Sequence, residues 1–251
     1  MEKETILQTI KENFMEILEV IMDIKILHMV DGAKQAKGLA VIIDVFRAFS
    51  LECYLMNNNA KKIIPVGDKD LAYKLKEENK DFVLIGERHG KMLSGFDYGN
   101  SPTSIENIDF TDKTIIHTTS AGTQGLANAT NADQIITGSL VNAQAIVNYI
   151  NKNNFETVSL VCMGLDATSQ TEEDNLCAEY IRSLLENKKI DIEEQIKKLK
   201  LTSGKKFFDK EQNDVFPEKD FYLCTEINKF DFILKLEKDE NNLNHMRRIL
   251  V

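Results

Sequence analysis

Short apolar runs alternate with amphipathic stretches along the middle of the chain. Each run is rich in β-branched residues, as expected for a buried strand, and the stretches between runs have apolar residues at helical spacing. The predicted strands span residues 39–45, 62–66, 82–86, 114–118, 134–138 and 158–164, and predicted helices span 69–78, 122–131 and 141–151. This order predicts an α/β fold in which helices cover a mostly parallel, mixed sheet as three α/β/α layers.

The strand–helix order occurs twice, at an offset of roughly 70 to 80 residues. Residues 41–44 align with 114–117, and residues 63–66 align with 135–138. The repeat predicts an internal duplication of a βαβαβ unit, although any two α/β stretches look similar at this level. We therefore expect one domain over residues 1–251, with similar subdomains at about 36–110 and 111–185.

The two ends of the chain have different patterns. Residues 5–22 have one apolar helical face. Residues 186–251 form a third part, in which the highly charged stretch 186–211 predicts a surface helix and a loop. Apolar runs at 222–224 and 232–236 then predict two C-terminal strands.

Composition excludes several classes of protein. The 251 residues are 43% hydrophobic and 28% charged, which is enough for a large core without a disulfide or metal staple. The formal net charge of −9 argues against a nucleic-acid or membrane partner. No apolar run is long enough to span a membrane, and residues 1–26 lack a signal-peptide pattern, so we expect a cytoplasmic protein. The four cysteines lack metal-site spacing and predict reduced, buried thiols.

Polar residues follow the predicted strands at their carboxyl ends, where open α/β sheets bind ligands. Asp44 ends a buried run, and a carboxylate there is desolvated unless it meets a cation such as Arg47 or a metal. Residues 118–123 offer hydroxyls and backbone N–H groups that can cradle an anion. Further polar residues at these ends are Glu87, Arg88, His89, Ser139, Asn142, Glu172, Glu173 and Asp174. Ser139 and Asp174 can equally serve as helix caps.

Together these groups fit a metal ion that bridges to a phosphorylated ligand. The sequence has no Walker-type loop, which argues against a nucleotide site of that type, and no Gly-x-Gly-x-x-Gly after a strand, which argues against a dinucleotide-binding fold. It also has no Gly-x-Ser-x-Gly, which argues against an α/β-hydrolase. Residues 88–90 match the Arg-His-Gly triplet of histidine phosphatases, but they follow the third strand rather than the first. A phosphohistidine mechanism is therefore a minor alternative.

Six sequence blocks, in the same order along the chain, resemble the 2-phosphosulfolactate phosphatase family. The blocks are residues 41–50, 85–88, 95–102, 118–123, 138–143 and 172–178, and Gly-Phe-Asp-Tyr-Gly-Asn-Ser-Pro at 95–102 is the most specific. The resemblance implies an α/β fold of its own and a Mg²⁺-dependent phosphatase acting on the 2-phosphate ester of a sulfonated lactate. In methanogens that step belongs to coenzyme M synthesis.

The expected site combines these residues with the resemblance. We expect catalytic roles for Asp44, Arg47 and Arg88. We expect Mg²⁺ to be held by Asp44, Glu173 and Asp174. The expected substrate-binding residues are Asn100, Ser101, Thr118, Thr119, Ser120, Ser139 and Asn142.

Water attack is the default mechanism, with a covalent aspartyl-phosphate on Asp44 as its alternative. The expected partner is a small anionic phosphorylated substrate, and a homodimer stays open. Three other functions compete with this prediction: a phosphatase for another phosphorylated hydroxy acid, a catalytically altered binding protein for an anionic metabolite, and a structural subunit.

Overall fold

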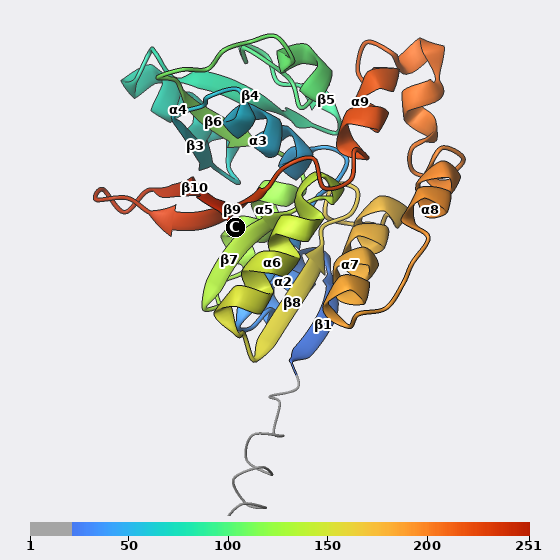
Figure 1. The fold of residues 1–251 in the computed structure, drawn as a ribbon. Helices are drawn as coiled ribbons and strands as arrows, with labels where there is room; N and C mark the ends of the chain where they lie inside the picture. Colours follow the sequence, from blue (N-terminus) through green and yellow to red (C-terminus); the bar gives the residue numbers. More distant parts are fainter. Residues whose placement is uncertain (1–21) are drawn as a thin grey trace, which may run out of the picture.

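The computed structural model describes residues 22–251, so residues 5–21 of the predicted N-terminal helix lie outside the described part. Ten strands form one mixed sheet (Figure 1). Their order across the sheet is β1 (Asp23–His28), β8 (Thr157–Cys162), β2 (Leu39–Ile43), β7 (Gln134–Gly138), β9 (Phe232–Lys238), β10 (Asn244–Leu250), β3 (Lys62–Pro65), β6 (Thr114–Thr118), β4 (Val83–Arg88) and β5 (Lys91–Met92).

Helices pack on both faces of this sheet, so the predicted α/β/α class is confirmed. The helices are α2 (Met29–Gln35), α3 (Ala48–Asn57), α4 (Lys69–Glu78), α5 (Gly122–Asn128), α6 (Ala143–Asn153), α7 (Glu172–Leu185), α8 (Ile192–Leu199) and α9 (Glu218–Cys224). Alternate residues of β2 enter opposite cores: Ala40 and Ile42 join the core with α2, α3 and α5, whereas Val41 and Ile43 join the core with α6 and α7. This double burial explains the continuous apolar run of β2.

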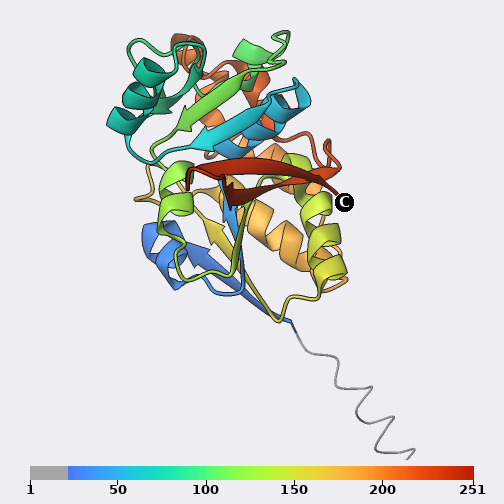
Figure 2. The same ribbon diagram turned by 90° about the vertical axis from the view of Figure 1, so that its left-hand side faces the viewer.

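The strands form two parallel groups that run in opposite directions. Strands β1, β8, β2 and β7 are parallel to one another, and so are β3, β6 and β4. The antiparallel hairpin β9–β10 joins β7 to β3 and crosses the molecule between the groups (Figure 2). Figure 1 shows the groups on opposite sides of this hairpin.

The first strand of each predicted repeat lies between the second and third strands of the other repeat. Strand β2 lies between β7 and β8, and β6 lies between β3 and β4. Two duplicated units that exchanged their first strands would give this order. The duplication itself, and the subdomain boundaries at 36–110 and 111–185, stay predictions.

The C-terminal part differs from its prediction in one element. Residues 222–224 form the last turn of α9 rather than a strand, because Phe221 and Cys224 are both buried at helical spacing while Tyr222 is exposed. The predicted strand at 232–236 is confirmed within β9, and β1 and β10 were not expected.

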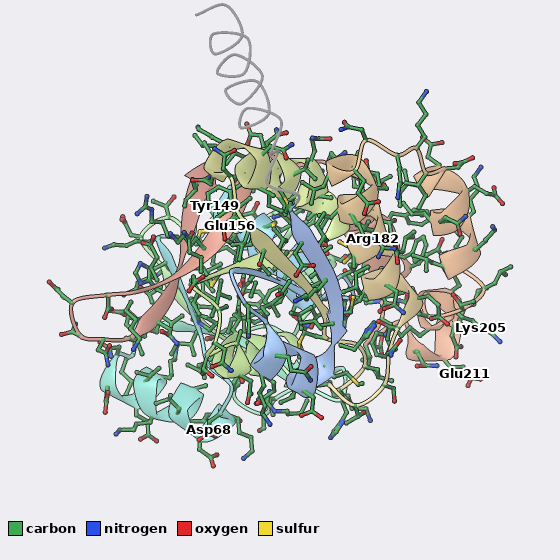
Figure 3. The ribbon with its side chains drawn as sticks, turned by 90° about the horizontal axis from the view of Figure 1, so that it is seen from below. Asp68, Tyr149, Glu156, Arg182, Lys205 and Glu211 are labelled. Atoms are coloured by element: carbon green, nitrogen blue, oxygen red, sulfur yellow. The ribbon has the colours of Figure 1, made fainter. Side chains whose placement is uncertain are left out.

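Seen from below (Figure 3), Lys205 and Glu211 lie on one flank and Asp68 at the start of α4 lies toward the other.

Two further sequence predictions concern the cysteines and the membrane. Cys53, Cys162, Cys177 and Cys224 are all buried free thiols, as predicted. Within residues 22–251, the helices are all too short or too polar to cross a bilayer.

Candidate active site

A pocket of about 380 Å³ lies where the carboxyl ends of β2, β4, β6 and β8 come together. Its wall includes Asp44 and Arg47 after β2, Glu87 at the end of β4, and Ser120 after β6. Glu173 of α7 completes this group of polar side chains. The pocket thus lies at the strand ends where the sequence predicted a site.

Asp44 is a buried residue of the pocket wall, and its carboxylate is held by backbone N–H groups. Its Oδ1 accepts a hydrogen bond from the N–H of Ala48 at 3.1 Å, and its Oδ2 accepts one from Gly122 at 2.9 Å. Burial is the largest cause that raises the pKa of Asp44 to about 7, and the carboxylates of Glu87 and Glu173 act in the same direction. Asp44 can therefore both accept and release a proton near neutral pH.

Gly122 allows this close approach to Asp44. A Cβ at position 122 would lie 2.9 Å from Oδ2 of Asp44 and 3.0 Å from Cζ of Phe49. Only glycine leaves room there for both the carboxylate and the buried ring.

Glu87 lines the pocket, whereas the sequence predicts a catalytic role for its neighbour Arg88. The carboxylate of Glu87 accepts hydrogen bonds from the backbone of Ser120 at 2.7 Å and of Gly90 at 2.6 Å. Arg88 does not line the pocket; its Nη2 donates to Oγ1 of Thr118 at 2.9 Å and to the carbonyl of Gly67 at 3.2 Å. Strand alternation in β4 could have indicated that only one of the two neighbours faces the site.

Arg47 reaches the pocket as one half of a buried ion pair. Its Nη1 donates to Oδ2 of Asp220 at 2.7 Å, and the two side chains are 3% and 0% exposed. The same Nη1 donates to the carbonyl of Val215 at 2.8 Å, and the guanidinium lies 4.9 Å from the ring centroid of Phe216. Asp220 also accepts a hydrogen bond from Oγ of Ser101 at 2.9 Å. Ser101, which the sequence predicted to bind substrate, therefore has its hydroxyl bound to Asp220 and lies outside the pocket lining.

Glu173 and Asp174 are neighbours with different surroundings. Glu173 lines the pocket, and its Oε2 is buried without a hydrogen-bond partner among residues 22–251. Asp174 lies outside the lining, and its two oxygens accept from the N–H groups of Val45 and Gly164, each at 2.8 Å. Burial raises the pKa of both carboxyls. Asp174 therefore ties the ends of β2 and β8 together.

Lys206 lines the same pocket and was not predicted. Burial lowers its pKa, while the charge of Glu173 opposes this change. Its ammonium lies 5.1 Å from the ring centroid of Phe216. The sequence assigned residues 186–211 to solvated surface, and the structure corrects this for Lys206 and for the buried ring of Phe207. These aromatic rings anchor the segment over the pocket.

The remaining predicted ligands divide into two groups. Asn100 and Ser120 line the pocket. Hydroxyls and amides that serve local turns lie outside it: Ser139 and Asn142 form a reciprocal capping box, and Thr119 pairs with Thr123. Thr118, as the partner of Arg88, also lies outside the lining.

Sequence comparison identifies the family. The sequence model of the 2-phosphosulpholactate phosphatase family matches residues 26–239. The chain belongs to this family. Two relatives named "Probable 2-phosphosulfolactate phosphatase" support the assignment: one from Bacillus subtilis (strain 168) is 32% identical over 203 residues, covering 79% of this chain and 87% of the relative. Another, from Clostridium perfringens (strain SM101 / Type A), is 30% identical over 226 residues, covering 84% and 91%.

A third relative of the same name, from Caldicellulosiruptor saccharolyticus, is 41% identical over 149 residues, covering 58% of this chain and 61% of its own. The resemblance inferred from the six sequence blocks is confirmed. The family to which the chain belongs is a family of phosphatases. The matched region contains β2, β4, β6, β8 and the segment with Lys206, which together supply most of the pocket.

Proposed function

We propose that this family member is a Mg²⁺-dependent phosphatase that hydrolyses 2-phospho-3-sulfolactate to sulfolactate and phosphate. The observation that carries the proposal is the pocket itself, which combines the buried carboxyls of Asp44 and Glu173 with the cations of Arg47 and Lys206. The substrate carries a phosphate, a carboxylate and a sulfonate, and so needs cationic partners. The names of the relatives point to the same substrate.

The donor set fits Mg²⁺. Glu173 has a buried oxygen without a partner among residues 22–251, and Asp44 lies on the same pocket wall. No group of three or more His, Cys, Asp or Glu side chains in that range is close enough to form a metal site by itself. Mg²⁺ commonly takes only one or two carboxylates and completes its shell with water and substrate phosphate. Asp44 and Glu173 would hold the ion, which supplies charge neutralisation at the phosphoryl oxygens.

The cationic and amide groups bind the substrate. Arg47 and Lys206 would compensate the phosphate and sulfonate charges, and the burial of Arg47 makes such contacts stronger than in bulk water. The amide of Asn100 donates a hydrogen bond that orients the ester. Ser120 lines the pocket beside it, with its hydroxyl donating to Glu87 at 3.2 Å. The other predicted residues lie outside the pocket lining and would support the surrounding structure rather than touch the substrate: Arg88, Ser101, Thr118, Thr119, Ser139, Asn142 and Asp174.

Asp44 acts as the general base. A water molecule beside Asp44 gives its proton to the carboxylate and attacks phosphorus, and the phosphorus–oxygen ester bond breaks as the new bond forms. The alkoxide that leaves takes a proton from solvent and becomes the 2-hydroxyl of sulfolactate, and the proton on Asp44 returns to solvent. A covalent aspartyl-phosphate on Asp44 is the alternative, and an inactive Asp44→Asn protein that retains metal affinity would favour it.

The test is phosphate release from a panel of esters, with Mg²⁺ and after removal of Mg²⁺ by a chelator. We expect 2-phospho-3-sulfolactate to react faster than phospholactate, because phospholactate lacks the sulfonate that a cation in the pocket would bind. We expect the chelator to abolish turnover and added Mg²⁺ to restore it. Turnover of none of these esters, together with tight binding of sulfolactate, would contradict the proposal and indicate a binding protein.

A further inference from the structure

A chain of three polar side chains leads from the protein core to the pocket. Glu52 in α3 and His117 in β6 are both 0% exposed. Nδ1 of His117 lies 2.8 Å from Oε1 of Glu52, and its Nε2 lies 3.3 Å from Oδ1 of Asn100, which lines the pocket. None of the predicted catalytic or metal-binding roles involves Glu52 or His117.

The hydrogen-bond roles along this chain follow from the chemistry of each atom. Oδ1 of Asn100 can only accept, so Nε2 of His117 carries the hydrogen. One further proton lies between Nδ1 of His117 and the carboxyl of Glu52. Both ring nitrogens are thereby engaged, and the orientation of the imidazole is fixed by α3 on one side and Asn100 on the other.

Such a pair is expensive to bury. A carboxyl group inside a helix-packed core destabilises the fold unless its partners compensate, and Oε2 of Glu52 has no hydrogen-bond partner among residues 22–251. An apolar pair of the same size would pack there with less penalty. The hydrogen bond from His117 to Asn100 connects this pair to the pocket, and a role in packing alone would not require that connection.

We infer that Glu52 and His117 are positioning residues that fix the amide of Asn100, so that its Nδ2 faces the pocket and donates to an anionic oxygen of the substrate. In the described part of the chain Nδ2 has no hydrogen-bond partner, while Oδ1 is occupied by His117. The imidazole also polarises the amide and strengthens it as a donor. This inference rests on the proposed function for the identity of the anion.

Two substitutions at His117 separate positioning from packing. His117→Gln places an amide N–H near the former Nε2 and keeps a donor for Asn100. His117→Asn places its amide near the former Nδ1, so it keeps Glu52 but loses Asn100. For 2-phospho-3-sulfolactate we expect KM to rise about tenfold in His117→Asn and less than about threefold in His117→Gln, with kcat less affected.

A double-mutant cycle shows whether His117 acts through Asn100. In an Asn100→Ala background, His117→Asn should raise KM by less than about twofold more, because the group that it positions is gone. Equal effects of His117→Asn and His117→Gln, or a full tenfold effect of His117→Asn in the Asn100→Ala background, would overturn the inference. Far-ultraviolet circular dichroism and thermal unfolding identify variants that have lost the fold.

A measurement on the wild-type chain does not depend on turnover, and it uses Asn100→Ala only to assign signals. The side-chain NH₂ signals of Asn100 are assigned by their loss in Asn100→Ala and followed during a titration with inorganic phosphate. We expect these signals to shift with the added phosphate. Unchanged Asn100 signals, whether or not other pocket signals move, would overturn the inference. If no ester is turned over, the proposed function fails, while this titration still decides the role of Asn100.

Discussion

We expect removal of the ion pair between Arg47 and Asp220 to lower the stability of the fold strongly. Asp220→Ala leaves the guanidinium of Arg47 buried without its anion and removes the acceptor of Ser101 Oγ and of the Thr103 N–H. Breaking one side of a buried pair destabilises proteins by about 3–5 kcal/mol. For a chain of this length that corresponds to a fall in melting temperature of roughly 6 to 20 °C.

The assay is urea unfolding of Asp220→Ala beside a matched surface control. The neighbouring Lys219 forms an exposed pair with Glu106, in which the side chains are 54% and 36% exposed. Exposed pairs contribute about 0–1 kcal/mol, so Lys219→Ala should leave the unfolding free energy nearly unchanged. Equal destabilisation by Asp220→Ala and Lys219→Ala would show that the buried pair contributes no more to stability than the exposed one.

The same pair gives a rescue experiment. An Arg47→Met/Asp220→Leu double variant replaces both charges by apolar groups and should recover part of the lost stability, since no uncompensated charge stays buried while Ser101 and the Thr103 N–H still lack their acceptor. It should not recover phosphatase activity, because Arg47 is the cation that the proposed mechanism uses. Recovery of both properties would show that the pair is structural only.

Two further predictions concern Asp44 and its neighbour Gly122. Because burial raises the pKa of Asp44 to about 7 from 3.8, the folded protein binds a proton that the unfolded chain releases, so this group lowers the unfolding free energy as pH rises from about 4 to about 7. In metal-free protein, urea unfolding at pH 5 and pH 7.5 should show a smaller loss in Asp44→Asn than in wild type; equal losses would contradict this. Gly122→Ala should lower kcat at least tenfold, as roughly expected when a reacting group is displaced, because the new Cβ would displace the Asp44 carboxylate. Gly99→Ala, whose Cβ would meet only Met92 at 3.4 Å, is its control in the same kinetic assay.

The fold class followed from local patterns, because each buried strand had its own signal. The run containing β2 is apolar throughout since both of its faces enter a core, and the amphipathic stretch 69–78 coincides with α4. The strand order did not follow, because nothing within β2 specifies that it lies between β7 and β8. Residues 222–224 show the limit of short apolar runs, which fit a strand and a buried helix end equally well.

The site was predictable where a residue was unusual in its own segment. Asp44 ends a buried apolar run, and Glu173 follows a strand end in an acidic cluster; both line the pocket. Local sequence could not decide between Glu87 and Arg88, because the choice depends on which face of β4 meets the pocket. Lys206 comes from a distant charged segment that reaches the site only through tertiary packing of Phe207.

The hydroxyl-rich turns misdirect sequence analysis for a physical reason. Ser and Thr side chains readily satisfy nearby backbone groups, as Thr119 and Thr123 do, so their presence after a strand does not by itself indicate a ligand site.

The most direct test of the central claim, that this pocket hydrolyses the phosphate ester, is phosphate release from 2-phospho-3-sulfolactate by Asp44→Asn protein in the presence of Mg²⁺. Its matched control is Asp68→Asn, the same change at the N-cap of α4, where asparagine caps a helix as well as aspartate does. We predict that Asp44→Asn folds but loses at least about a hundredfold in kcat, in keeping with loss of a general base, while Asp68→Asn keeps wild-type turnover. Full activity of the Asp44→Asn protein would contradict it.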